Sequence, residues 1–439
     1  LPFGWTGTNG DLHYATELVK FVRKEFGDKF TIAVAGSPEG HIACRSLEAD
    51  ISFLKQKQDE GADYIMTQLC WDMDQFRYWM DAIRAAGIWL PVDVGIMPVL
   101  DAAATINMAL SRNGCVMSRD LCEIISKHWI FPNPFAPNES EESIAAKKAS
   151  FKEAGIEYTI KLIDEYRPEL IIFGKSMVLH REPVAEIRAF VDAQNIPTTI
   201  MYDMAHVLGL IGDHFQNPFA DGAEIVTGST HKTFFGPQRG VIGVNYQRED
   251  LKWGLWETIE TRTFPGSVSN HHLGTLLGQL MAAYEMNAFK DEYQKAVVEN
   301  AKHFAKCLAA EGLDVAGDPA MDYTETHQVI VKVGYAHGPE VADRLEANNI
   351  VCNYQATPEE EGFSASGALR MGVSEMTRFG FGPAEFDELA ALMADCILRG
   401  KDISEDVVRL RSRFTTMHYC FNDAEFNAAL DRFAGEIGF

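Results

Sequence analysis

The chain has 439 residues, of which 46% are hydrophobic, and it carries a formal net charge of −24. This length and hydrophobic content are typical of a folded protein with two or three domains, and they exclude a disordered chain. Strong negative charge repels a phosphate backbone, so we expect no nucleic-acid partner. The sequence contains no long uncharged apolar run and no basic-then-apolar leader, so we expect no membrane partner and a cytoplasmic protein.

The eight cysteines are scattered along the chain and form no CxxC pair. Reduced thiols in a cytosolic protein are therefore expected, in preference to a disulfide framework or a zinc site. The sequence accordingly predicts no metal site.

Hydrophobic spacing predicts alternating strands and helices in the N-terminal third of the chain. The predicted strands cover residues 31–35, 64–69 and 92–96. The predicted helices cover residues 15–26, 47–61, 76–83, 102–110 and 119–128. The β-α-β-α-β order of the first elements implies parallel strands that are joined by right-handed crossovers.

A run rich in proline and asparagine at 131–138 predicts a linker, and a long helix is predicted from there to about Tyr166. The strands predicted beyond it are short and apolar on both faces, at 170–173, 198–201, 224–227 and 241–244. Such strands are typical of a sheet that helices cover on both sides.

A helical stretch over about 272–313 and an alternating strand at 328–333 predict a smaller α+β domain at the C-terminal end. We therefore expect three parts. They are a β/α region over 1–166, the main part of a large α/β domain over 167–315, and an α+β domain over 316–439.

A lysine on a short turn and an acid upstream of it form the most informative pair in the chain. Lys232 lies in the turn Thr-His-Lys-Thr at 230–233, and Asp203 ends an apolar strand. A lysine amine can form a Schiff base with the aldehyde of pyridoxal phosphate (PLP), and a carboxylate can keep the pyridine nitrogen protonated. Taken singly, such an acid is usually a cap and such a lysine a solvated surface residue, but their order and context favour a PLP site.

Four motifs resemble serine hydroxymethyltransferase, a fold-type-I PLP enzyme, over about residue 168 to the C-terminal end. They read "YDMAHVLGL", "ADGAEIVTGSTHKTFFGPQRG", "TFPGSVSNHHLGTLLG" and "SGALRMGVSEMTRFG". The resemblance implies that Lys232 forms the Schiff base, that Asp203 contacts the pyridinium nitrogen and that His206 bonds the ring hydroxyl. Three further positions are implied to line the cofactor site: Ser176, Thr230 and His231. Arg370 is implied to hold the substrate carboxylate through its planar fork of donors.

The chain departs from the transferase pattern in several places. Its Gly-Pro-Arg-Gly-Gly segment reads Gly-Pro-Gln-Arg-Gly at 236–240, and Ser269 and Asn270 replace the paired glycines that reach the partner's cofactor phosphate. The family's catalytic glutamate, its Ser-Gly-Ser phosphate loop and its ring-stacking histidine have no counterpart upstream of Ser176. Because the family shares cofactor contacts between subunits, the resemblance implies a homodimer.

The N-terminal part resembles methylenetetrahydrofolate reductase, a flavin-dependent (β/α)8 barrel, up to about Tyr166. The matching runs read "FTIAVAGSPEGH", "SLEADISFLKQKQDEGADYIMTQLCWD", "VDVGIMPVL" and "FKEAGIEYTIKLIDEY". The positions implied to contact FAD are His41, Asp50 and Lys57, and Gln68 is implied to contact tetrahydrofolate. Without a ligand, the same residues would form an ordinary turn and an exposed helix face. The sequence opens after the family's fourth strand, so the first four strands are expected to be absent.

Together the two resemblances imply an α/β fold. It would consist of a partial (β/α)8-barrel-like part, a fold-type-I PLP transferase sheet and a small α+β C-terminal domain. Three functions stay open: a PLP-dependent serine/glycine hydroxymethyltransferase fused to a reductase-like segment, a flavin-dependent methylenetetrahydrofolate reductase, and an inactive chimeric join of two enzyme fragments. The first residue is Leu rather than Met, which is expected of a processed chain or of a fragment of a longer reading frame.

Overall fold

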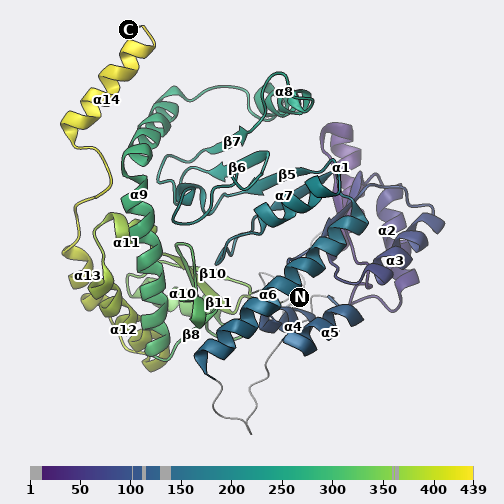
Figure 1. Ribbon diagram of the computed structural model, residues 1–439, viewed down its shortest axis with the longest axis horizontal. Coiled ribbons are helices and arrows are strands. Elements are labelled where there is room, and N and C mark those ends of the chain that lie inside the picture. Colours follow the sequence, from purple (N-terminus) through teal and green to yellow (C-terminus); the bar gives the residue numbers. More distant parts are fainter. Residues whose placement is uncertain are drawn as a thin grey trace. The chain divides into compact units, whose positions relative to one another are not determined.

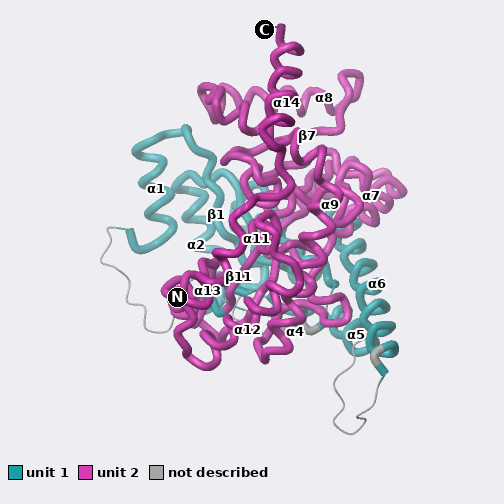
Figure 2. The backbone as a smooth tube through the Cα atoms, turned by 90° about the vertical axis from the view of Figure 1, so that its left-hand side faces the viewer, with its two compact units in different colours: residues 1–166, 356–367 teal, residues 167–355, 368–439 magenta. Residues whose placement is uncertain are grey.

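The computed structural model describes residues 12–100, 102–110, 115–128, 140–357, 360 and 365–438. The chain separates into two compact units (Figure 2). Unit 1 comprises residues 1–166 with 356–367, and unit 2 comprises residues 167–355 with 368–439. The linker expected at 131–138 lies outside the described residues.

Unit 1 contains a three-stranded parallel sheet in the order β1-β2-β3. The helices of this unit are labelled α1 to α6 in Figure 1. Its helices and strands are α1 (Ala15–Phe26), β1 (Ala33–Gly36), α2 (Leu47–Asp59), β2 (Tyr64–Leu69), α3 (Met73–Ala85), β3 (Val92–Gly95), α4 (Ala102–Leu110), α5 (Arg119–His128) and α6 (Glu141–Tyr166). A single 3-10 turn, Gly27–Lys29, follows α1. The predicted β-α-β-α-β order and its parallel pairing are confirmed.

Local chemistry explains where two of the unit 1 helices begin. The Ser46 side chain accepts a hydrogen bond from the Ala49 N–H at the start of α2, and Asp72 caps α3 in the same way. Both helices bury one apolar face against the sheet, and Ile65 of β2 and Trp79 of α3 are fully buried there. The capped ends and the apolar faces together account for this β/α layer.

The first sheet of unit 2 has four strands in the order β4-β5-β6-β7. Its strands are β4 (Leu170–Phe173), β5 (Thr199–Asp203), β6 (Ile225–Ser229) and β7 (Gly240–Val244). The first three strands are mutually parallel, whereas β7 runs antiparallel to β6. Because the carboxyl ends of parallel strands meet at one edge, the turns after β4, β5 and β6 all open at that edge.

The outer strands of this sheet are not buried on both faces. Leu170 and Ile172 of β4 are 46% and 58% exposed, and Val241 and Ile242 of β7 are 40% and 37% exposed. The expectation of a sheet that helices cover on both sides is therefore wrong for β4 and β7, although β5 and β6 are largely buried. The physical reason is that an edge strand lacks a neighbour that would shield it, and an apolar run in the sequence does not reveal which strand lies at the edge.

The second sheet of unit 2 is antiparallel, in the order β10-β11-β9-β8. Its strands are β8 (Asp314–Val315), β9 (Gln328–Lys332), β10 (Asn353–Gln355) and β11 (Ala368–Gly372). Because β8 pairs with β9, this sheet begins two residues before the boundary expected at 316.

Helix α9 (Leu273–Ala310) is the longest element of unit 2, with 38 residues. Its first half is largely exposed, whereas its second half packs against α12 (Pro383–Arg399), where Phe304 contacts Phe386 with ring centroids 5.1 Å apart. The other helices of unit 2 are α7 (Val184–Ala193), α8 (Trp253–Thr261), α10 (Gly338–Ala347), α11 (Ser374–Arg378), α13 (Ser404–Ser412) and α14 (Asp423–Glu436). Three short helical turns complete the unit: Leu208–Leu210, Arg262–Ser267 and Pro319–Met321. In the described part of the chain, no helix is both long and apolar enough to cross a bilayer.

Candidate active site

The predicted lysine and acid come together at the carboxyl edge of the β4-β5-β6-β7 sheet. Asp203 is the last residue of β5, and Lys232 lies in the turn that follows β6. The Lys232 Nζ is 3.2 Å from the Nε2 of His206, which follows β5. The Asp203 Oδ1 accepts hydrogen bonds from the Ala205 N–H at 3.0 Å and from the Thr227 hydroxyl at 3.2 Å. These bonds fix the carboxylate beside the histidine and the lysine.

Buried hydroxyl groups hold the lysine turn on both sides. The Thr230 hydroxyl lies 2.7 Å from the Pro237 carbonyl and accepts a hydrogen bond from the Arg239 N–H at 3.1 Å. On the other side, Thr233 donates to the His206 carbonyl at 3.2 Å. Thr230 thus closes the turn around the lysine, while His231 is exposed to solvent.

The second sheet contributes an arginine and a glutamine to the same place. Arg370 of β11 donates to the Ser176 carbonyl at 3.2 Å, and the Gln328 Nε2 donates to that carbonyl at 3.0 Å. The Gln328 Nε2 also lies 3.4 Å from the His206 Nδ1. Five of the predicted positions, Lys232, Asp203, His206, Ser176 and Arg370, are therefore gathered in one region of unit 2.

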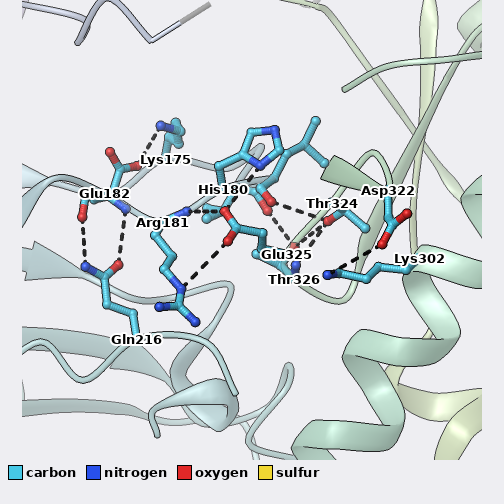
Figure 3. Close-up of polar contacts among 12 residues, drawn as sticks. Lys175, His180, Arg181, Glu182, Gln216, Lys302, Asp322, Thr324, Glu325 and Thr326 are labelled. Atoms are coloured by element: carbon cyan, nitrogen blue, oxygen red, sulfur yellow. Dashed lines mark hydrogen bonds and ion pairs between the residues drawn. The ribbon is translucent and has the colours of Figure 1, made fainter. Parts of the chain in front are cut away.

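A polar network fixes the loop that follows β4 and carries Ser176 (Figure 3). Near the end of the loop, the Glu325 carboxylate accepts from the Arg181 N–H at 3.3 Å and lies 3.4 Å from the His180 ring. The next residue, Glu182, forms two backbone bonds with the Gln216 side chain, at 3.1 and 2.8 Å. The end of the loop is thus tied to the segment before β9 and to the segment after β5.

The basic groups of this centre are shifted toward their neutral forms. Burial, and then the positive charge of Arg370, lower the pKa of Lys232, although the Asp203 carboxylate opposes them. Burial followed by repulsion from Lys232 lowers the pKa of His206 to about 4. Burial also lowers the pKa of His327 to about 3, and its Nδ1 has no hydrogen-bond partner. Both histidines are therefore neutral at physiological pH.

The orientation of Gln328 determines which nitrogen of His206 carries the proton. The Gln328 Oε1 accepts from the Val178 N–H at 2.9 Å, so the amide presents its NH2 group to the His206 Nδ1. A neutral histidine whose Nδ1 accepts carries its proton on Nε2, and this Nε2–H points at Lys232. The Lys232 amine then accepts that hydrogen bond, which requires a free lone pair and so favours the neutral amine.

The candidate residues of unit 1 make fewer contacts with one another than those of the Lys232 centre. A cavity of about 370 Å³ is lined by Glu39, His41 and Cys44, among others. The Asp50 carboxylate accepts from the His41 N–H at 3.2 Å, so these two predicted positions lie together. The Lys57 Nζ donates to a main-chain carbonyl of β1 at 3.4 Å.

Gln68, the position expected to contact folate, lies on β2. Its Oε1 accepts a hydrogen bond from the Leu69 N–H at 2.9 Å. This is a local bond between neighbours in the chain, and it leaves the proposed role in folate binding as a prediction.

Three residues near these sites were not predicted. Gln328 and His327 look in the sequence like the ordinary polar start of an apolar strand. Gln328 is revealed only by its contacts with Ser176 and His206, and His327 only by its burial and its charge interaction with His206. Glu39 lies in the turn that follows β1, and burial raises the pKa of its carboxyl to about 7. The neighbours that bury these three residues are far away in the sequence, so no local sequence pattern could identify the residues as part of a site.

Two family models match different parts of the chain. The model of methylenetetrahydrofolate reductase matches residues 2–123, and the model of serine hydroxymethyltransferase matches residues 148–393. The second match covers more than half of the 439 residues. The chain belongs to the serine hydroxymethyltransferase family. Both resemblances expected from the motifs are thus confirmed, and the hydroxymethyltransferase match begins inside α6, earlier than the motifs indicate.

Curated serine hydroxymethyltransferases are similar to this family member over part of their length. The protein of Archaeoglobus fulgidus is 42% identical over 277 residues, which cover 62% of this chain and 61% of the relative. The protein of Methanothermobacter thermautotrophicus is 39% identical over 269 residues, which cover 60% of this chain and 61% of the relative. The chain therefore spans about three fifths of the length of the curated hydroxymethyltransferases that it matches.

A solved structure supports the same fold. The crystal structure of L-threonine transaldolase from Pseudomonas fluorescens in its internal aldimine state matches with a TM-score of 0.55 and 30% sequence identity, and the match covers 63% of each chain. The expected α/β fold, with a PLP-transferase sheet after a reductase-like part, is confirmed.

Proposed function

We propose that this member of the serine hydroxymethyltransferase family binds PLP at Lys232 and transfers a hydroxymethyl group between serine and glycine, with tetrahydrofolate as the one-carbon carrier. The observation that carries this proposal is the 3.2 Å contact between the Lys232 Nζ and a neutral His206. The similarity to curated hydroxymethyltransferases and to a PLP-dependent neighbour supports it.

The residues at the sheet edge fit the ring end of PLP. A partly buried lysine with a lowered pKa suits attachment to an aldehyde, and the fixed Asp203 carboxylate suits a protonated pyridine nitrogen. When bound, PLP supplies an electron sink for a carbanion at the amino-acid Cα. Arg370 would hold the substrate carboxylate, because its planar donor fork matches two carboxylate oxygens.

The protein's own groups would control the protons at this centre. Gln328 keeps the His206 proton on Nε2, and Nε2–H donates to the Lys232 amine. Burial and the charge of Arg370 disfavour an ammonium group at Lys232, so the amine keeps its lone pair available for reaction. His206 would then hold the ring hydroxyl of the cofactor once the amine is engaged.

We further propose that the protein is a homodimer and that a partner copy completes the phosphate end of the site. A cluster of exposed apolar side chains on α8, the turn after it and the start of α9 supports self-association: Leu255, Phe264, Val268, Leu273 and Leu276. A cytoplasmic location is supported by the scattered positions of the cysteines, which form no CxxC pair in the sequence.

Reduction with borohydride tests the proposal directly. Adding PLP to the purified protein should give a visible absorbance band, and borohydride should remove that band and leave the cofactor covalently on one peptide. Lys232→Ala should abolish both signals. The matched control is Lys295→Ala, which removes an exposed lysine that is paired only with Glu299. A band that survives in Lys232→Ala, or cofactor attached to another lysine, would contradict the proposal.

A second candidate function rests on the cavity beside His41, which supports binding of FAD and a flavin-dependent methylenetetrahydrofolate reductase activity. Lys57 of α2, whose Nζ reaches a carbonyl of β1, would then neutralise the diphosphate of the flavin. A bound yellow flavin that NADH bleaches, and that Lys57→Ala weakens, is the expected result. If the purified chain binds neither chromophore and aggregates, it is an inactive join of two enzyme fragments.

A further inference from the structure

Three side chains with metal-binding atoms meet where α9 packs against α12, away from the residues discussed above. His303 and Cys307 lie one turn apart on α9, and Asp387 lies on α12. The His303 Nε2 is 2.8 Å from the Asp387 Oδ1, the Cys307 Sγ is 2.8 Å from the same oxygen, and the sulfur and the nitrogen are 3.3 Å apart. No other group of three such donors is found among the described residues.

We propose that His303, Cys307 and Asp387 bind a first-row transition-metal dication, with Zn²⁺ as the natural occupant. A thiolate and an imidazole are poor ligands for Mg²⁺ and Ca²⁺, whereas zinc accepts sulfur, nitrogen and carboxylate oxygen together. Three protein ligands leave one tetrahedral position open for water or another small ligand. The absence of a CxxC pair from the sequence does not oppose such a site, because two of its ligands lie one helical turn apart and the third comes from another helix.

The distances between the donor atoms allow a metal to enter with little movement. Bonds of about 2.0–2.3 Å in a tetrahedron place the ligand atoms about 3.3–3.6 Å apart. The three donors, now 2.8–3.3 Å apart, need to separate by at most about 0.8 Å. The two helices can supply a stable frame, because Phe304 of α9 and Phe386 of α12 are both buried and their ring centroids are 5.1 Å apart.

Access and local charge also favour a cation. The side chains of His303 and Asp387 are 35% and 59% exposed, so an ion can reach the cluster from solvent. Glu311, one turn beyond Cys307, adds negative charge near the thiol, and Lys306 opposes it. Binding would displace the thiol proton of Cys307, because the thiolate is the ligand.

This site shares no residue with the Lys232 centre, so it is independent of the proposed function. It would hold α9 against α12, because the ligands come from both helices and metal binding adds to the free energy of folding. Unit 2 should therefore melt at a higher temperature with Zn²⁺ than after treatment with a chelator.

Titration of the reduced, chelator-treated protein with Co²⁺, under anaerobic conditions, tests the inference. One equivalent of Co²⁺ should produce a thiolate-to-cobalt charge-transfer band and the visible bands of a tetrahedral site, and Zn²⁺ should remove both. Cys307→Ser should eliminate the charge-transfer band. Asp387→Asn should weaken Co²⁺ binding by at least about 10–100-fold, the range known for changes in the outer shell of metal sites.

The matched control is Cys122→Ser, which removes an exposed free thiol in unit 1 and should leave the cobalt spectrum unchanged. Circular dichroism should show that all variants keep their helices. A wild-type protein without the charge-transfer band, or a Cys307→Ser variant that retains it, would overturn the inference. Loss of the band in Cys122→Ser would assign the metal to another thiol and would overturn it equally.

Discussion

The Lys232 centre of unit 2 and the His41 cavity of unit 1 are organised in different ways. The Lys232 amine contacts another side chain, His206, and that histidine is in turn approached by Gln328. In unit 1, His41 contributes its backbone N–H to Asp50, and Lys57 donates to a backbone carbonyl. A site whose side chains already contact one another is preorganised, whereas side chains bonded to backbone must exchange those bonds for a ligand.

Substitution of one glycine in each unit should give the largest difference between the units in stability and in PLP binding. Gly174 has φ +108° and a Cβ there would lie 2.1 Å from the Asp203 carbonyl oxygen, so Gly174→Ala forces the β5 terminus to move. We expect a loss of more than about 3 kcal/mol from the free energy of unfolding of unit 2, together with loss of PLP binding. Denaturant unfolding and PLP absorbance measure the two effects.

The counterpart in unit 1 is Gly155→Ala, whose Cβ would lie 1.7 Å from the Val99 carbonyl oxygen. It should destabilise unit 1 while leaving PLP binding intact. Gly400→Ala is the control, because φ is +64° but no atom lies within 4 Å, so its cost should be about 1 kcal/mol. Loss of PLP binding in Gly155→Ala would show that the Lys232 centre depends on unit 1.

The stability of the two units should also change with pH in opposite directions. The pKa of His206 falls from 6.5 to about 4 on folding, so its contribution to stability is complete above pH 6.5 and is lost as the pH falls toward 4. The pKa of Glu39 rises from 4.5 to about 7, so its contribution is complete below pH 4.5 and is lost as the pH rises through 7.

Hydrogen exchange resolved by peptide, corrected for intrinsic rates, measures these opposite trends at pH 5 and pH 7. Unit 2 should be less protected from exchange at pH 5 than at pH 7. Unit 1 should be less protected at pH 7 than at pH 5. His206→Gln should reduce the pH dependence of unit 2 and leave the part that is due to His327, and Glu39→Gln should reduce the pH dependence of unit 1. Parallel profiles in the two units would contradict the assigned burial of these groups.

A smaller effect is expected from Gln328→Leu. Without the amide, nothing holds the His206 proton on Nε2, so the neutral amine at Lys232 loses a hydrogen-bond donor. Loss of about 1.4 kcal/mol corresponds to a tenfold slower attachment of PLP at neutral pH, with less effect at high pH, where the amine is neutral in any case. Stopped-flow absorbance across a pH series gives these rates.

The control is Gln58→Leu in unit 1. Gln58 also bridges two backbone groups, with bonds of 2.9 Å to the Gly87 carbonyl and 2.8 Å from the Trp89 N–H, but it belongs to unit 1. Its substitution should leave the rate of PLP attachment unchanged. An equal slowing in both variants would show that Gln328 acts only through general stability.

The sequence predicted most elements within a few residues, because hydrophobic spacing and breaker residues act locally. It also identified Lys232, Asp203 and His206, because these residues fall in motifs close together in the chain. It could not identify Gln328, which meets His206 across 122 positions of sequence. Nor could it foresee that β7 runs antiparallel and that β4 lies at an edge, because strand order depends on pairing partners and not on the strand itself.

The smallest predicted effect concerns that edge. Ile172 on β4 is 58% exposed, so Ile172→Thr removes little buried surface and should change the free energy of unfolding by less than about 0.5 kcal/mol. Ile200 on the neighbouring strand β5 is fully buried, and Ile200→Thr leaves both a cavity and a buried hydroxyl, at a cost of about 2–4 kcal/mol. Because exposed apolar edges promote association, Ile172→Thr should also reduce aggregation in light scattering. If Ile172→Thr lowers the free energy of unfolding as much as Ile200→Thr does, another surface covers β4 in solution. The edge strand and the central strand would then not differ in burial.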